Sequence, residues 1–133
     1  MKIAKREDFA LIFMNELSKY YPGEFVSLGI VAQKTRLSPL FLKHIAAVLL
    51  EKKLVESKEG ISGGYRLSKP PQKIAVSEII KAISKGIVAP SCVHGGVCRL
   101  KQASCSCLAL WDNVNKQLYA YLDKVSLADF GKL

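Results

Sequence analysis

The chain has 133 residues, half of them hydrophobic, which excludes a disordered protein and allows one domain with its own core. Twenty Lys and Arg against eleven Asp and Glu give a formal net charge of +9, which favours a polyanionic partner such as nucleic acid, although some basic domains are merely soluble. No apolar stretch is long enough to span a bilayer and no signal peptide is recognised, so we expect a cytoplasmic protein without a membrane partner.

The first expected helix follows Asp8, because a carboxylate in a first turn meets the exposed amides and the positive end of the helix dipole. Pro22-Gly23 is expected to end this element. Apolar residues at helical spacing predict its buried face, namely Phe9, Phe13, Leu17 and Tyr20.

Two further helices separated by a tight turn are expected over 27–34 and 39–53. Ser27 predicts the N-cap of the first, and Ser38-Pro39 gives the second a capping residue and a proline at its first position. An inward face is predicted by Phe41, Leu42, Ile45, Val48 and Leu49, and an outward face by Leu40, Lys43, His44 and Lys52. Lys43 and His44 can reach base edges or phosphates of DNA, although two exposed polar residues on a helix are as often merely solvated.

Two short strands are predicted over 54–58 and 65–68, joined by the glycine-rich segment from Glu59 to Gly64. A phosphate-cradling loop is the weaker alternative, because a Gly-Lys-Ser/Thr element and the strand-loop-helix order are both missing. The expected fold is therefore mainly α, a winged helix-turn-helix with a β-hairpin wing. The predicted DNA-binding surface comprises Ser38, Pro39, Leu40, Lys43, His44, Lys58, Glu59, Ser62, Gly63, Gly64 and Tyr65.

After Pro70-Pro71, a helix is expected from Val76 with Ser77 as its cap and Glu78 in its first turn, ending at Lys85-Gly86. The predicted organisation is a DNA-binding domain over 1–86, a cysteine-rich loop over 87–107 and a long helix with a tail over 108–133. Apolar residues spaced by threes and fours favour a dimerisation helix, with packing inside one chain as the alternative: Leu108, Trp111, Val114, Leu118, Tyr121 or Leu122, and Val125.

Four cysteines, Cys92, Cys98, Cys105 and Cys107, are spaced C-x5-C-x6-C-x-C. Thiolates bind zinc, copper(I) and iron–sulfur clusters, and the wide loops favour an iron–sulfur cluster over zinc, with thiol redox chemistry third. Two residues apart on a helix, Cys105 and Cys107 would point about 200° from each other. One of them would then be a bystander if the helix begins before Cys105.

Several stretches together resemble the Rrf-two family of winged-helix transcription regulators. They are Asp8-Phe9-Ala10-Leu11, Val26-Ser27-Leu28, Gly60-x-x-Gly63-Gly64-Tyr65-x-Leu67, Pro70-Pro71, and the cysteine loop followed by Ala109-Leu110-Trp111. The resemblance implies a homodimeric repressor or activator on a palindromic operator of double-stranded DNA, with helix 39–53 in the major groove and the wing at the minor groove. It also implies a 2Fe-2S or 4Fe-4S cluster held by Cys92, Cys98 and Cys105.

The chain departs from its cluster-binding relatives at three places. The gap between Cys98 and Cys105 is one residue longer, Leu108 replaces the histidine ligand of IscR-like members, and Glu59 replaces a wing arginine. In NsrR-like members a carboxylate matching Asp8, from the partner subunit, completes the site. Asp8 is therefore the expected fourth ligand, with Cys107 and His94 as the alternatives. Ligation by His94 would strain the short loop that contains it.

We therefore predict a regulator, not an enzyme, whose operator binding is controlled by a cluster sensing redox state, nitric oxide or cluster status. The alternatives are a zinc-stabilised DNA-binding protein without sensing and a small iron–sulfur electron carrier. A carrier needs neither a winged helix nor a basic surface, and zinc would leave the protein colourless.

Overall fold

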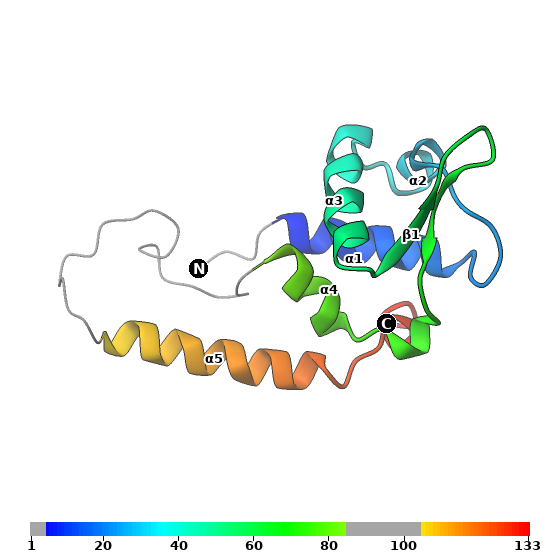
Figure 1. Cartoon of the computed structure of the whole chain (residues 1–133). Helices are drawn as coiled ribbons and strands as arrows, with labels where there is room; N and C mark the ends of the chain where they lie inside the picture. Colours follow the sequence, from blue (N-terminus) through cyan, green and yellow to red (C-terminus); the bar gives the residue numbers. More distant parts are fainter. Residues whose placement is uncertain (1–4, 85–104) are drawn as a thin grey trace.

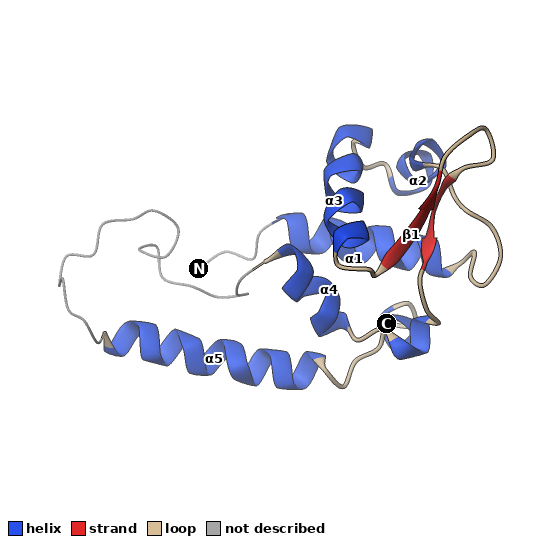
Figure 2. Ribbon diagram, in the orientation of Figure 1, coloured by secondary structure: helices blue, strands red, loops and turns tan. Residues whose placement is uncertain are grey.

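The computed structural model describes residues 5–84 and 105–133 (Figure 1). In the described part, helix predominates and the strands form one antiparallel hairpin (Figure 2), so the predicted class, mainly α with a winged helix-turn-helix, is confirmed. Its elements in chain order are α1 (Lys5–Ser18), α2 (Leu28–Thr35), α3 (Pro39–Glu51), β1 (Val55–Lys58), β2 (Gly64–Leu67), a 3-10 turn (Pro71–Lys73), α4 (Val76–Ile83), α5 (Ser106–Leu122) and α6 (Leu127–Phe130).

Helix α1 is the centre of the core. It packs against α2, α3, β2, α4 and α6, and Phe13 and Met14 on it are completely buried. The helix is described from Lys5, so Asp8 lies inside its first turn rather than at its start. It ends at Ser18. The buried face predicted from the apolar spacing is confirmed only in part, because Phe9 and Tyr20 are half-buried.

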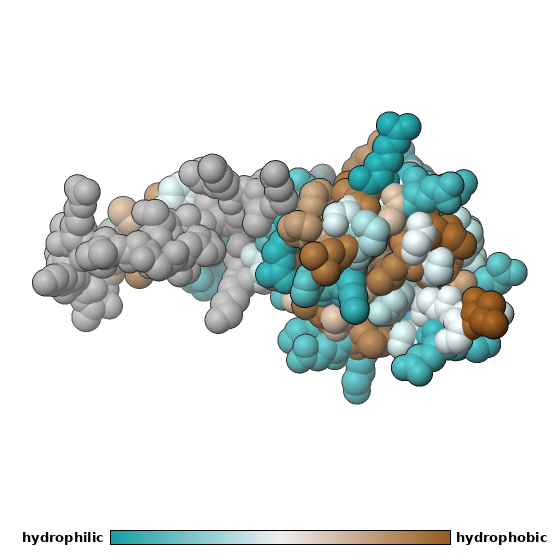
Figure 3. All heavy atoms as spheres, turned by 90° about the horizontal axis from the view of Figure 1, so that it is seen from above, coloured by the Kyte–Doolittle hydropathy of each residue, from teal (hydrophilic) through white to brown (hydrophobic). Residues whose placement is uncertain are grey.

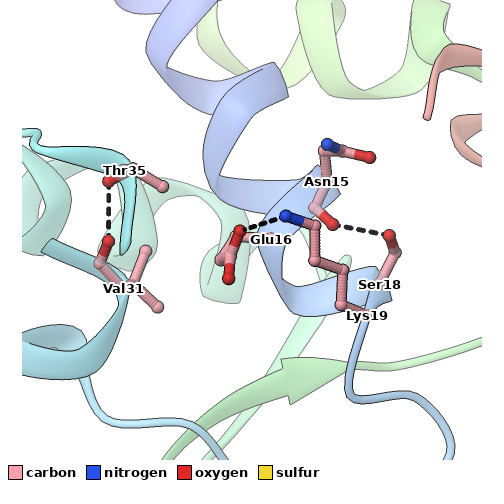
Figure 4. A network of polar contacts seen from close by, with 6 residues as sticks. All are labelled: Asn15, Glu16, Ser18, Lys19, Val31 and Thr35. Carbon is pink, nitrogen blue, oxygen red and sulfur yellow. Dashed lines mark hydrogen bonds and ion pairs between the residues drawn. The ribbon is translucent and has the colours of Figure 1, made fainter. Parts of the chain in front are cut away.

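Several polar groups near the C-terminal ends of α1 and α2 are satisfied locally (Figure 4). The buried carboxylate of Glu16 accepts a hydrogen bond from Lys19 Nζ at 2.8 Å, and this bond raises the pKa of the lysine. The hydroxyl of Thr35 donates to the carbonyl of Val31 at 2.7 Å and so tightens the last turn of α2. The core beneath the helix-turn-helix therefore contains a carboxylate without leaving it unpaired.

The turn between α2 and α3 follows the predicted signals closely. Ser27 caps α2 by accepting from the amide of Ile30 at 3.2 Å, and Pro39 is the first residue of α3. Ser38 precedes α3 in an extended conformation but makes no side-chain cap, which corrects the role expected for its hydroxyl. Helix α3 ends at Glu51, earlier than predicted, because Lys53 adopts a left-handed φ of 62°.

The buried face of α3 consists of Leu42, Ile45, Ala46 and Leu49. Phe41 was predicted to point inward, but it is 46% exposed and meets the ring of Phe9 edge-on, with the centroids 5.5 Å apart. One residue is a rotation of about 100° on a helix, so a face centred on 42, 45, 46 and 49 leaves position 41 at its rim.

Residues after α5 return to the N-terminal half of the chain. The amide of Val76 donates to Val125 and that of Leu127 to Ile74, both at 2.8 Å, and the fully buried Leu127 seats α6 against α1. Ser77 was predicted to cap α4, but the N-cap is Ala75. Ser77 lies within the helix, buried, and donates to the carboxylate of Asp123. Among the described helices, none is long and apolar enough to cross a membrane.

Candidate nucleic-acid interface and cysteine centre

The first turns of α3 carry the side chains predicted to meet base edges. Leu40, Lys43 and His44 are exposed, as are Ser38 and Pro39 just before and at the start of the helix. Their directions are fixed because the opposite side of the helix is buried in the core. The beginning of α3 and the loop of the hairpin point to the same side of the molecule (Figure 1), and Figure 3 looks onto that side.

The hairpin loop has a closed, defined shape. The amide of Gly63 donates to the carbonyl of Gly60 at 3.0 Å, and Gly60 has a φ of 105°. A Cβ on Gly63 would lie 2.1 Å from the carbonyl oxygen of Lys58, so only glycine fits there. Three predicted DNA contacts, Lys58, Glu59 and Ser62, are exposed around this loop.

The base of the wing is built by Gly64 and Tyr65. A Cβ on Gly64 would meet the carbonyl oxygen of Val26 at 2.2 Å, and Tyr65 exchanges two backbone hydrogen bonds of 2.8 Å with Val26. The Tyr65 ring also meets Phe13 edge-on, with the centroids 6.2 Å apart. Both residues therefore attach the wing to the core, and their contact with DNA stays a prediction.

A cationic cluster on the wing was not predicted. The guanidinium of Arg66 lies over the ring of Phe25 at 4.4 Å, its Nε donates to the carboxylate of Glu56 at 2.9 Å, and Lys58 Nζ lies 5.9 Å from the same ring. Glu56 and Arg66 are directly opposite each other in the hairpin. Opposite charges in facing positions were the available signal, but the position of Phe25 depends on tertiary packing.

Two open clefts flank this surface. The first, about 460 Å³, lies between the wing and α2 and is lined by Glu24, Phe25, Ser27, Ile30, Lys58, Ile61, Ser62 and Gly63. The second, of similar volume, lies between the starts of α1 and α3 and is lined by Arg6, Leu40, Phe41, His44 and Ile45. Arg6 thus adds a cation beside the outward face of α3 that sequence reasoning did not include.

Of the four cysteines, Cys105 and Cys107 are described, whereas Cys92, Cys98 and also His94 lie outside the described residues. Cys105 is the extended N-cap residue of α5 and Cys107 lies in its first turn. The amides of Leu108 and Cys107, with a smaller contribution from the Cys107 thiol, lower the pKa of Cys105 because they stabilise the thiolate, although its side chain does not close the helix as a cap.

The first residue of α5 decides whether Cys105 and Cys107 both lie on the helix and so point in opposite directions. The helix begins after Cys105, at Ser106, so the condition that made one cysteine a bystander is not met. Cys105 is extended, and the Cys107 thiol makes a small contribution to lowering its pKa. A thiolate at an open helix N-terminus has the chemistry that a soft metal centre requires of its ligand.

Asp8 lies on α1 and Cys105 directly precedes α5. Burial raises the pKa of Tyr119 on α5, and the charge of Glu7 on α1 adds to that shift. Within the described residues, no group of three or more His, Cys, Asp or Glu side chains is arranged to hold a metal.

Helix α5 buries none of its residues completely. Its contact within the chain is with α4, where Lys81 lies 5.0 Å from the ring of Tyr119 and 4.0 Å from the carboxylate of Asp123. Apolar side chains remain accessible along it: Leu108 is 42% exposed, Leu110 55% and Tyr121 67%. Trp111, Val114, Leu118 and Leu122 are half-buried.

A helix-turn-helix whose second helix turns polar residues outward, with a glycine-closed hairpin beside it, defines the winged-helix class of DNA-binding regulator. The family model for Rrf2, described as an iron-dependent transcriptional regulator, matches residues 3–132. The chain therefore belongs to the Rrf2 (Rrf-two) family, whose members are transcription regulators that bind DNA.

Named relatives agree with this membership. IscR of Cereibacter sphaeroides is 28% identical over 137 residues, covering 99% of this chain and 88% of that protein, and IscR of Escherichia coli is 28% identical over 131 residues, covering 97% and 79%. The solved structure of T. potens IscR has a TM-score of 0.76 and 29% identity over 99% of this chain and 87% of its own. CymR of B. subtilis, described as the global cysteine regulator, has a TM-score of 0.76 and 27% identity, covering 99% and 97%. These relatives are transcription regulators, not enzymes.

Proposed function

We propose that this chain is a homodimeric transcription regulator whose binding to a palindromic operator is controlled by an iron–sulfur cluster. The observation that carries the proposal is the position of Cys105 directly before α5, the one described helix without a fully buried residue. Backbone amides of the first turn lower the pKa of its thiol. The names of the IscR relatives and the iron-dependent description of the family support the same reading. Cys92, Cys98 and Cys105 are the proposed cysteine ligands.

The cofactor would supply a group that responds to redox change or nitric oxide, while the chain supplies the ligands and the connection to DNA. Asp8 remains the proposed fourth ligand. As the resemblance to NsrR-like members implies, this carboxylate would come from the partner subunit of a dimer. Carboxylate oxygen is a harder and weaker ligand for iron in such a centre than thiolate, which suits displacement by a signal.

A path from the cysteines to the DNA surface follows from contacts within the chain. Helix α5 contacts α4 through Lys81, Tyr119 and Asp123, and Ser77 ties α4 to the same carboxylate. Helix α4 packs in turn on α1 and α3. We infer that a change in how Cys105 is held at the start of α5 alters the angle between the two α3 helices of a dimer.

Anaerobic purification with assays of iron, acid-labile sulfide and zinc tests the cofactor. We expect a brown protein with charge-transfer absorption, containing iron and sulfide. A colourless protein with stoichiometric zinc would instead support a zinc-stabilised DNA-binding protein. A cluster without any affinity for duplex DNA would support an electron carrier.

Single substitutions test the ligand set. Asp8→Ala should perturb the visible circular dichroism and shorten the lifetime of the reconstituted cluster, whereas Cys107→Ser should leave both near wild type. Mixing Asp8→Ala with Cys105→Ser subunits should restore one intact site per heterodimer if the carboxylate comes from the partner. The reverse pattern for the two single variants would make the site an all-cysteine one.

A further inference from the structure

Ile61 is the most exposed large hydrophobic residue of the described chain, with a relative exposure of 108%. It lies at the tip of the loop between β1 and β2, between Gly60 and Ser62. A single exposed apolar residue is common on protein surfaces and by itself indicates nothing. Its position is informative because the fold leaves its side chain uncovered in the loop that joins the two strands of the wing.

The loop holds Ile61 in a defined position. The hydrogen bond from Gly63 to Gly60 closes the turn behind it, and the close approach of Gly63 to the Lys58 carbonyl fixes the two arms of the loop together. Below the tip, Lys58 and Arg66 contact the Phe25 ring, and Arg66 is bound to Glu56. Ile61 therefore lies at the end of a closed loop, and the two strands below this loop carry the cations Lys58 and Arg66.

The neighbouring charge argues against anchoring of the tip by phosphates. Glu59 is exposed beside Ile61 and repels the DNA backbone, so the loop has no cation at its end. The cations that can bind phosphate, Lys58 and Arg66, lie on the strands below. This separation suits a tip that enters a groove while its stem stays at the backbone, as in proteins that insert an apolar side chain between base steps.

We propose that Ile61 is a specificity-determining residue that inserts as an apolar wedge into the minor groove of the operator, at a flexible pyrimidine–purine step. The inference rests on the proposed function, because it requires α3 and the wing to bind one duplex. An inserted side chain favours base steps that are easy to unstack, and it does not recognise the hydrogen-bonding pattern of the bases. The sequence preference at that position should therefore follow the deformability of the base step.

The probe is a duplex selected by the full-length wild-type protein from a random pool, with its wing contact located by hydroxyl-radical footprinting. Ile61→Ser and Ile61→Leu are compared on this duplex, with 2-aminopurine at the step reporting unstacking and end-to-end fluorescence transfer reporting bending. We expect Ile61→Ser to abolish both signals and weaken binding on the order of tenfold. Ile61→Leu, which keeps an apolar wedge, should preserve the signals. Circular dichroism should show both variants folded, because the side chain has no internal contact.

A second arm changes the DNA instead of the protein. Replacing the pyrimidine–purine step at the wing contact by a stiffer GC step should cost the wild type the same factor and should not weaken binding by Ile61→Ser further. If the wild type and Ile61→Ser bind the selected duplex equally and the step stays stacked, the wedge is overturned while DNA binding stands. If the wild type selects no duplex at all, the proposed function and the wedge fall together.

Discussion

The helix-turn-helix and α5 lie in one chain but are stabilised in opposite ways. Helix α3 buries a continuous face against α1, where Leu42 and Phe13 are completely inaccessible. Helix α5 is longer, with 17 residues, yet buries none of them. Among the described elements, α5 packs against α4.

An isolated helix of this length is marginal in water, because most helical stability in proteins comes from packing an apolar face. The exposed apolar residues of α5 therefore indicate a helix that is incomplete in a single chain. Helix α3 is stabilised by the core of its own chain, whereas we propose that α5, which directly follows Cys105, is covered by a partner subunit.

The largest expected effect on stability is that of a cavity in the core beneath α3. Leu42→Ala removes a side chain that is 0% exposed and should cost about 2–5 kcal/mol of unfolding free energy, measured by urea denaturation. Leu40→Ala on the same helix, where the side chain is 66% exposed, should change stability by less than about 0.5 kcal/mol. Similar losses for the two variants would mean that α3 is not seated as described.

A charge on α5 should separate assembly from folding. Leu118→Asp places a carboxylate among the half-buried apolar residues of α5 and should raise the dimer dissociation constant about 100-fold or more, read by analytical ultracentrifugation. The far-ultraviolet signal of the winged helix should persist. Gln117→Asp adds the same charge at an exposed position and serves as the control. A monomeric wild type would contradict the role given to α5.

The parts of the fold that the sequence predicted are those set by neighbouring residues. Ser27 capping α2, Pro39 opening α3 and the glycine-closed hairpin all depend on contacts within a few positions. The errors came where a distant partner decides. Ser77 has the chemistry of a cap, but its hydroxyl donates to Asp123, 46 residues later, and the N-cap residue of the helix is Ala75 instead.

The candidate site divides in the same way. Exposure of Lys43 and His44 follows from helical phase, since the core face of α3 is marked by apolar spacing. The relation of Cys105 to Cys107 could not be predicted, because it turns on whether the helix starts one residue earlier or later. The Phe25 cluster was missed because its members come from separate segments. Which residues bind the cofactor stays a prediction.

On the proposed DNA-binding surface, Lys43 should contribute more to operator binding than any other single cation. Lys43→Ala should cost about 1–3 kcal/mol and relax the preference at one base position if the side chain reads a base edge. Selection of binding sequences by each protein measures the preference. Lys52→Ala, at the C-terminal end of the same helix, removes an equal charge and should weaken binding without changing the preferred sequence. An unchanged preference for Lys43→Ala would assign it to the phosphate backbone.

The short helix that returns α5 to the core offers a smaller test. Ser126 caps α6 by accepting from the Asp129 amide at 3.0 Å, and Ser126→Ala should cost about 1 kcal/mol of unfolding free energy. The pKa of Asp129 is lowered mainly by a hydrogen bond from the Ser126 amide. The stabilisation from its carboxylate is therefore present above the unfolded pKa, about 3.9, and is lost as pH falls through the lower folded value. Asp129→Asn should remove this acid dependence in denaturation followed between about pH 5 and 2.5.

The smallest expected effect concerns the charge beside the wing tip. Glu59 is exposed next to a surface that we propose faces phosphates, so Glu59→Arg should tighten binding to a random duplex several-fold at low salt. The slope of log affinity against log salt should steepen by about 0.9 if the new arginine contacts one phosphate. Because salt screens exposed charges, the gain should shrink towards zero near 1 M salt. Glu51→Arg, with the same change of charge at the far end of α3, controls for net charge alone. Equal gains from both variants would mean that the gain reflects net charge alone and that the wing tip does not lie near DNA.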